Sequence, residues 1–224
     1  MERSPGQLSV SFRLVTLMLA LAALLPSTGC LHLLMATGIY LWDGGNNVPA
    51  ECKALEKQRV VVVCRPPASS EYSFAGASRE LAKRVSDLLE MNVPGIEVVN
   101  QKEVDNWIDE SDLTDFKDVA KAVKADMVVH VELEHFDLYK GPTLYQGNAE
   151  ITISVYDMKD KGKRVWERNL GQVLYPANSA TPSQDKPVQH FQRDFVVVLA
   201  DRIARNFYKH EAHADFAMDA LSNR

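Results

Sequence analysis

Residues 125–138 have the sequence ADMVVHVELEHFDL, and polar and apolar side chains alternate through the middle of this stretch. The apolar residues there are Val129, Val131 and Leu133, and the polar residues between them are His130, Glu132 and Glu134. A period of two is typical of a β-strand with one buried side and one solvent-facing side. The stretch is therefore predicted to be a half-buried strand.

Two further strands are predicted directly after this one. Gly141 and Pro142 form a turn signal, after which residues 144–156 alternate in the same way. A polar turn at residues 160–163, with the sequence DKGK, then reverses the chain into residues 164–174. The three segments together predict an antiparallel meander whose apolar side the rest of the chain must cover.

The elements around the meander are predicted from apolar periodicity and cap signals. Before the meander they are a fully buried strand at 60–64, a helix at 74–89, a short strand at 96–99, a helix after an Asn100 N-cap, and a helix at 115–124 capped by Thr114. After the meander they are a loop at 175–187 and a helix at 188–208. Right-handed crossovers make the first three strands parallel. The predicted fold class is α/β (α+β): a mixed five-stranded sheet, with three parallel strands plus an antiparallel meander, and helices mainly on one face. A single domain is expected over residues 59–209, followed by a tail at 210–224.

The first 29 residues have the composition of a secretory signal peptide. Arg3 and Arg13 precede an apolar run at residues 14–25, and small residues follow at 27–29. Positive charge, an apolar core and small residues in this order are typical of exported proteins. Residues 1–29 are therefore predicted to direct the rest of the chain out of the cytoplasm.

The residues around Cys30 resemble the lipobox of bacterial lipoproteins, in which the cysteine is lipidated and becomes the mature N-terminus. The small pair Thr28-Gly29 matches that pattern, whereas Ser27 stands where the family usually has an aliphatic residue. The resemblance implies that Cys30 is the lipidation site, and that the membrane is a partner through the N-terminal lipid.

The segment after Cys30 bears on where the chain is anchored. Residues 30–58 are expected to form a linker, and Leu31, in place of Asp, implies by the same resemblance the outer membrane rather than the inner one. Apolar character nevertheless continues past the cysteine. An uncleaved membrane helix over residues 14–35 and plain secretion both remain open.

Composition narrows the classes of function. The chain has a net charge of -5, and removing residues 1–29 takes away two arginines and one glutamate, which gives -6. An acidic chain has no electrostatic reason to bind nucleic acid, so no nucleic-acid partner is expected. Cys52 and Cys64 either form one disulfide in an oxidising compartment or remain, respectively, a free linker thiol and a buried small hydrophobe.

Three polar residues of the first meander strand form the strongest candidate for a metal site. His130, Glu132 and Glu134 are expected on one side of that strand, and Glu150 could face them from the next strand. An imidazole beside carboxylates is a donor set for a divalent metal. Polar residues also alternate on a wet sheet face for solubility alone, and arginines on the third strand could pair with these carboxylates. The second interpretation is favoured, so no metal, cofactor or catalytic residue is predicted.

The same side of the meander is predicted to bind a protein partner or a second copy of the chain. Aromatic and arginine side chains are enriched at the centre of protein interfaces. The candidate partner-binding residues are His130, Glu132, Glu134, Tyr156, Arg164 and Trp166.

Three short motifs in and around the meander resemble a pattern in bacterial envelope lipoproteins. They are an alanine-aspartate that opens a strand in residues 124–129, a strand that ends in aspartate over residues 147–157, and a glycine-lysine turn before valine-tryptophan in residues 162–166. The curli secretion lipoprotein, the lipoprotein activators of penicillin-binding proteins and the N-terminal domain of the Tol propeller protein share this pattern. The resemblance covers roughly residues 59–208 and implies their fold.

The sequence therefore predicts a membrane-anchored cell-envelope lipoprotein that is not an enzyme and that faces the periplasm. It is expected to bind a partner protein or itself through its sheet, without a cofactor. Two alternatives remain open: a metal-dependent envelope hydrolase, and a signal-anchored single-pass membrane protein with a structural role.

Overall fold

The computed structural model describes residues 47–66, 71–111 and 115–211, and the chain divides into two units, Met1–Asn47 and Val48–Arg224. The sheet and helices discussed below belong to the second unit. The predicted signal peptide at 1–29, the lipidation site at Cys30 and the Thr114 cap lie outside the described residues. Within the described ranges, no helix combines the length and the apolar character needed to cross a membrane.

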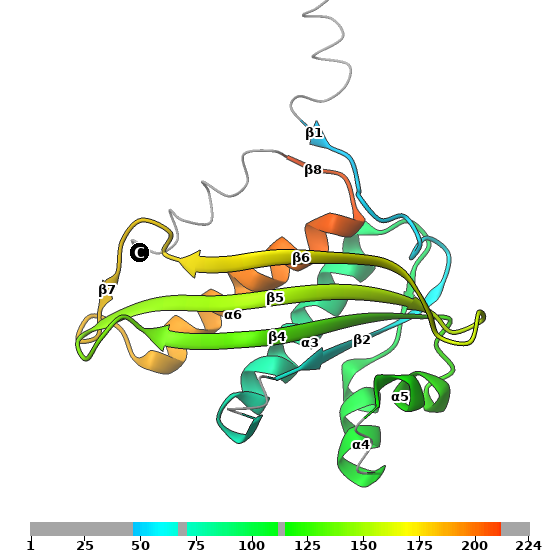
Figure 1. Cartoon of the computed structure of the whole chain (residues 1–224), viewed down its shortest axis with the longest axis horizontal. Coiled ribbons are helices and arrows are strands. Elements are labelled where there is room, and N and C mark those ends of the chain that lie inside the picture. The colour runs from blue at the N-terminus through cyan, green and yellow to red at the C-terminus, as the bar shows by residue number, and fades with distance from the viewer. Residues whose placement is uncertain (1–46, 67–70, 112–114, 212–224) are drawn as a thin grey trace, which may run out of the picture. The chain divides into compact units, whose positions relative to one another are not determined.

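The second unit is built on one mixed sheet with the strand order β3-β2-β4-β5-β6 (Figure 1). The strands are β2 (Arg59–Arg65), β3 (Glu97–Val98), β4 (Met127–Tyr139), β5 (Leu144–Asp157) and β6 (Lys163–Tyr175). β2 pairs in parallel with β3 and β4, whereas β5 is antiparallel to both β4 and β6. The predicted sheet of three parallel strands plus an antiparallel meander is confirmed. The two-residue strand β7 (Thr181–Pro182) adds to β5, while β1 (Asn47–Val48) and β8 (His210–Glu211) lie outside this sheet.

One face of the sheet carries the main core. Two long helices, α3 (Glu71–Asn92) and α6 (Val188–Ala204), pack against it, and they run behind the strands in Figure 1. A short 3-10 helix, η3 (Arg205–Phe207), continues α6. The apolar residues that alternate along β4 and β5, such as Val129, Ile151 and Ile153, are fully buried in this layer. Burial of this continuous apolar area is the main stabilising contribution to the fold.

The opposite face is covered only in part. The helices α4 (Gln101–Ser111) and α5 (Phe116–Ala122) form a second, smaller core with Val61 of β2 and Val128 of β4. The parallel part of the sheet is thus buried on both faces, as Val60, Val61 and Val62 show by having no exposed surface. The prediction of helices mainly on one face agrees with this arrangement.

Side-chain caps and one carboxylate fix where these elements begin. The Asn100 side chain accepts a hydrogen bond of 2.9 Å from the Lys102 backbone N–H, so the predicted N-cap of α4 is confirmed. The α5 helix is capped by Asp115, which accepts from the Lys117 backbone N–H. Asp126 accepts a hydrogen bond from the Arg59 backbone N–H, and this bond, together with its ion pair to Lys159, lowers the pKa of the Asp126 carboxyl. The start of β2 is thereby tied to the start of β4.

The two cysteines of the described region are free thiols, so the disulfide alternative is excluded there. Cys52 and Leu55 are both buried in the main core. Packing against the sheet therefore begins before residue 59, which was the expected start of the domain.

Candidate functional site

The part of the second face that α4 and α5 leave uncovered is a polar surface, which we call the open face. Its polar residues come from β4, β5 and β6 and include Glu132, Glu134, His135, Asp137, Asn148, Glu150, Thr152, Arg164, Glu167, Asn169 and Gln172. They alternate with buried residues such as Val131 and Ile151, because successive side chains of a strand point to opposite faces. In Figure 1 these three strands lie toward the viewer, in front of α3 and α6.

Hydrogen bonds link the side chains of the open face across the strands. The Thr152 hydroxyl donates to Glu134 Oε1 at 2.7 Å and accepts from Asn169 Nδ2 at 3.1 Å. Gln172 Nε2 donates to Asn148 Oδ1 at 3.1 Å. The hydrogen bonds therefore hold polar groups from three strands in fixed positions.

A second group on this face is centred on Glu167. This carboxylate forms an ion pair with Arg164 and accepts a hydrogen bond of 3.3 Å from the hydroxyl of the buried Ser154. Arg164 therefore has a partner within its own strand. It does not neutralise the glutamates of β4.

His130, a predicted partner-binding residue, is not at the solvent surface. It is 5% exposed, and its ring stacks on Phe116 of α5 at a centroid distance of 4.4 Å. The centroid of the half-buried Tyr156 ring lies 4.6 Å from the centroid of the same Phe116 ring. Burial lowers the pKa of His130, so the imidazole is neutral at pH 7. His130 is therefore part of the second core, where the Phe116 ring covers it.

Trp166 lies on the opposite face from the other predicted residues. Its ring packs on Phe207 at 5.4 Å, against the main core. The cause is an irregularity in β6: Val155 pairs with Trp166, but Tyr156 pairs with Arg164, which leaves Val165 as an extra residue. A β-bulge of this kind reverses which side chains face which side. The open face therefore brings together Glu132, Glu134 and Arg164, and excludes Trp166 and His130.

The sequence interpretation missed Thr152, Asn169 and Gln172. Their type gave no chemical signal, because threonine, asparagine and glutamine are ordinary on a wet strand face. Their partners become visible only when the register is known, since Thr152 pairs with Asn169 across a second irregularity of β6.

The metal hypothesis finds no support in the region that the structure describes. There, no group of three or more His, Cys, Asp or Glu side chains is placed to hold a metal ion. His130 is turned under Phe116, while Glu134 hydrogen-bonds to Thr152. Two of the three residues proposed as a donor set, His130 and Glu134, are therefore engaged in different contacts.

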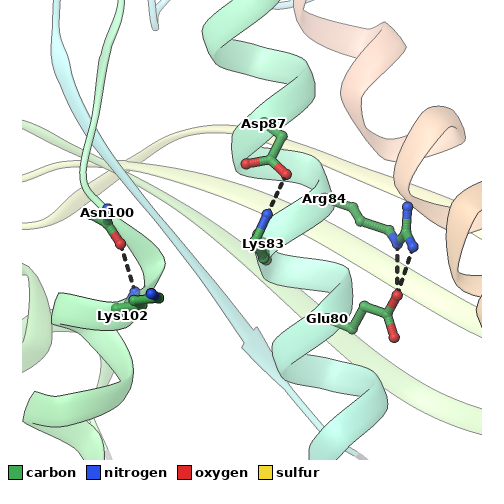
Figure 2. A network of polar contacts seen from close by, with 6 residues as sticks. All are labelled: Glu80, Lys83, Arg84, Asp87, Asn100 and Lys102. Atoms are coloured by element: carbon green, nitrogen blue, oxygen red, sulfur yellow. Dashed lines mark hydrogen bonds and ion pairs between the residues drawn. The ribbon is translucent and has the colours of Figure 1, made fainter.

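A separate groove of about 660 Å³ lies between α3 and the start of α4. Figure 2 shows its charged side chains: Lys83 pairs with Asp87 at 2.7 Å, and Arg84 pairs with Glu80 at 2.7 Å. Two buried side-chain oxygens, Ser86 Oγ and Gln101 Oε1, line this groove without a hydrogen-bond partner among the described residues. The ion pairs lie within α3, so they give the groove no excess charge of either sign.

Comparisons with known proteins give similarities of fold. No protein-family model and no curated protein matches the sequence. Among solved structures, the chain is similar to the PelC dodecamer from Paraburkholderia phytofirmans, with 13% identity, 72% of this chain and 95% of that chain covered, and a TM-score of 0.43. It is similar to lipoprotein GNA1162 from Neisseria meningitidis, with 14% identity, 65% of this chain and 96% of that chain covered, and a TM-score of 0.36.

A third similar structure is the LpoB C-terminal domain from Salmonella enterica, with 12% identity, 54% of this chain and 84% of that chain covered, and a TM-score of 0.37. Lipoproteins are thus among the solved structures that the chain is similar to. Identities and scores this low transfer no function to the chain.

Proposed function

We propose that this chain is a lipid-anchored protein of the cell envelope whose α/β domain, without enzymatic activity, binds a partner protein through the open face. The observation that carries the proposal is the uncovered half of the sheet, with polar side chains already ordered across three strands. Because these side chains are already held in place, less entropy is lost when a partner binds to them.

The charge of the open face indicates the kind of partner. Its charged residues include Glu132, Glu134, Asp137, Glu150, Glu167 and Arg164, so acidic groups dominate. Complementary potentials favour association, and like charges opposed across an interface disfavour it. In a two-fold symmetric dimer built on this face, the same acidic patch would meet itself. A different protein with a basic surface is therefore the partner that fits.

The anchor part of the proposal rests on the sequence around Cys30. A charged, apolar and small-residue leader ends directly before this cysteine. Lipidation there would hold the domain at the membrane, and Leu31 after the cysteine favours the outer membrane and a periplasmic domain.

Photo-crosslinking in the native envelope tests the binding surface. A photoreactive residue at Asn169, within the open face, is expected to crosslink to one discrete partner, and the double variant Glu134→Arg with Glu150→Arg should abolish that crosslink. The matched control places the photoreactive residue at Met91 of α3, which is 71% exposed on the far side of the sheet. Equal crosslinking from both positions, or a crosslink at Asn169 that survives charge reversal, would refute the assignment.

Mass spectrometry of the mature N-terminus tests the anchor independently. A lipidated Cys30 as the first residue is expected, together with release of the Cys30→Ala variant from the membrane fraction. A mature chain that retains residues 1–29 would refute lipidation while leaving the open-face assignment intact.

A further inference from the structure

A basic pocket lies at the end of the sheet where α5 meets the turn between β5 and β6. It has a volume of about 500 Å³. Its lining residues are Lys117, Ala120, Lys121, Lys124, Ala125, Met158, Lys159 and Lys161. Five of these eight side chains are lysines and none is a carboxylate, although the chain as a whole has a net charge of -5. The composition of the whole chain therefore does not explain this local excess of positive charge.

The lysines come from two segments that the fold brings into close contact. A Cβ atom built at Gly162 would lie 3.2 Å from Lys117 Cε, so the glycine allows the turn to approach α5. The Lys117 ammonium in turn lies 5.9 Å from the centroids of both the Phe116 and Tyr156 rings. These contacts place the Lys117 side chain between the helix and the turn.

Acidic neighbours neutralise only two of the five lysines. Lys121 pairs with Asp118 at 2.9 Å, and Lys159 pairs with Asp126 at 3.1 Å. Lys117, Lys124 and Lys161 have no carboxylate partner within the described residues. The pocket therefore has an excess of three positive charges.

Two of these three lysines occupy backbone positions that favour glycine. Lys124 has a φ of 54° and follows the end of α5, where the Ala125 N–H donates to the Ala120 carbonyl at 2.9 Å. Lys161 has a φ of 56° in the turn before Gly162. Left-handed backbone is unfavourable for a side chain with a Cβ, and helix ends of this type usually carry glycine. Lys57 also has a positive φ, so the conformation alone does not define the pocket.

We propose that this pocket is a binding site for a phosphate group. The ammonium of lysine is a compact point charge that binds phosphate oxygens from several directions. Three unneutralised ammonium groups are enough to balance the charge of a phosphate monoester, which is about -1.5 to -2 at pH 7, and they also suit the more highly charged pyrophosphate. The phosphate can belong to the headgroup of an anionic lipid or to a free molecule. This site is distinct from the open face, so the assignment does not depend on the proposed partner binding.

Lysine footprinting on the full-length chain tests this assignment. The protein is placed in phosphatidylcholine nanodiscs, and its amines are acetylated at constant ionic strength with increasing pyrophosphate. Lys117, Lys124 and Lys161 are expected to become protected in a saturable way, whereas Lys83 and Lys102, which line the groove beside α3, are not. A second arm uses nanodiscs that contain phosphatidic acid, whose headgroup is a phosphate monoester, and no pyrophosphate. Protection in that arm assigns the phosphate to a lipid headgroup, and protection only by pyrophosphate assigns it to a free molecule.

A pair of matched variants links the protection to the pocket. In the double variant Lys124→Gln with Lys161→Gln, protection of Lys117 should require at least about tenfold more pyrophosphate, because two charge-assisted contacts are lost. The control, Lys83→Gln with Lys102→Gln, removes the same charge elsewhere and should shift the midpoint by less than about twofold. The proposal is overturned if the pocket lysines are protected neither by pyrophosphate up to about 10 mM nor by the anionic lipid. It is also overturned if the two double variants shift the midpoint of Lys117 protection equally.

Discussion

Replacing Gly147 with alanine should destabilise the domain, because the main core leaves no room for a methyl group there. A Cβ built at Gly147 would lie 2.6 Å from two ring atoms of Phe195 and 2.7 Å from a third. Carbon atoms in contact prefer separations of about 3.5–4.0 Å. Phe195 has no exposed surface, and its ring stacks on Phe136 at 5.4 Å and on Tyr175 at 6.3 Å. The ring must therefore move by about 1 Å against neighbours that are themselves packed.

The expected cost of this substitution follows from overpacking. Insertion of a methyl group into a filled core destabilises by about 1–3 kcal/mol, and a fully buried ring places Gly147→Ala near the upper end of that range. For a domain of this size, each kcal/mol lowers Tm by roughly 2–4 °C. Urea unfolding of the full-length chain in detergent, followed by circular dichroism, measures the change. The matched control is Gly76→Ala in α3, where nothing lies within 4 Å of the added Cβ, and helix propensity should raise stability by up to about 1 kcal/mol.

A double-mutant cycle separates the steric cause from other effects of the alanine. If the clash with Phe195 is responsible, the Gly147→Ala, Phe195→Leu double variant should be more stable than the sum of the single changes implies, by more than about 1 kcal/mol. Additive effects of the two substitutions, or a neutral Gly147→Ala variant, would show that the core does not pack as described.

Three further predictions concern single side chains. Burial lowers the pKa of His130 below 6.5, so the unfolded chain takes up a proton before the folded chain does as the pH falls. The domain should therefore lose stability below about pH 6.5. Urea midpoints at pH 7.5 and 5.5 measure this loss, which should be absent in His130→Phe. Burial raises the pKa of the Cys64 thiol to about 12, and a hydrogen bond with Ser78 opposes this rise more weakly. Maleimide at pH 8 should therefore label Cys64 rapidly only after unfolding. Rapid labelling of the folded chain would contradict the packing. Lys161→Gly should stabilise the domain by about 1 kcal/mol in thermal unfolding, since glycine adopts a φ of 56° without strain; an unchanged or lower Tm would show that the turn is not strained.

The meander was predictable because two independent signals in the sequence agree. Period-two alternation fixes which residues of β4 and β5 face the core, and polar turns with Gly141 and Gly162 fix where the chain reverses. Both glycines have a positive φ in the structure. The strand pairs found between β4, β5 and β6 are the ones that these signals predict.

The composition of the open face was less predictable, because bulges interrupt the alternation. An extra residue near Glu134 keeps both Leu133 and Phe136 in the core, and the extra Val165 turns Trp166 inward. A bulge depends on the backbone of both strands, so alternation within one strand does not reveal it. The burial of His130 was missed for a different reason: periodicity identifies the apolar side of α5, but not the face of the sheet that receives it.

The open face follows from the way two kinds of strand pairing share one sheet. A parallel pair requires crossover helices, and these bury both faces around β2, which is 7 residues long. The meander strands β4, β5 and β6 have 13, 14 and 13 residues, so they extend well past β2 and past the helices α4 and α5 that its connections supply. An antiparallel extension of this kind needs only one buried face to be stable. Its other face is therefore free of packing constraints, and side chains such as Thr152 and Asn169 can be chosen for binding without loss of the core.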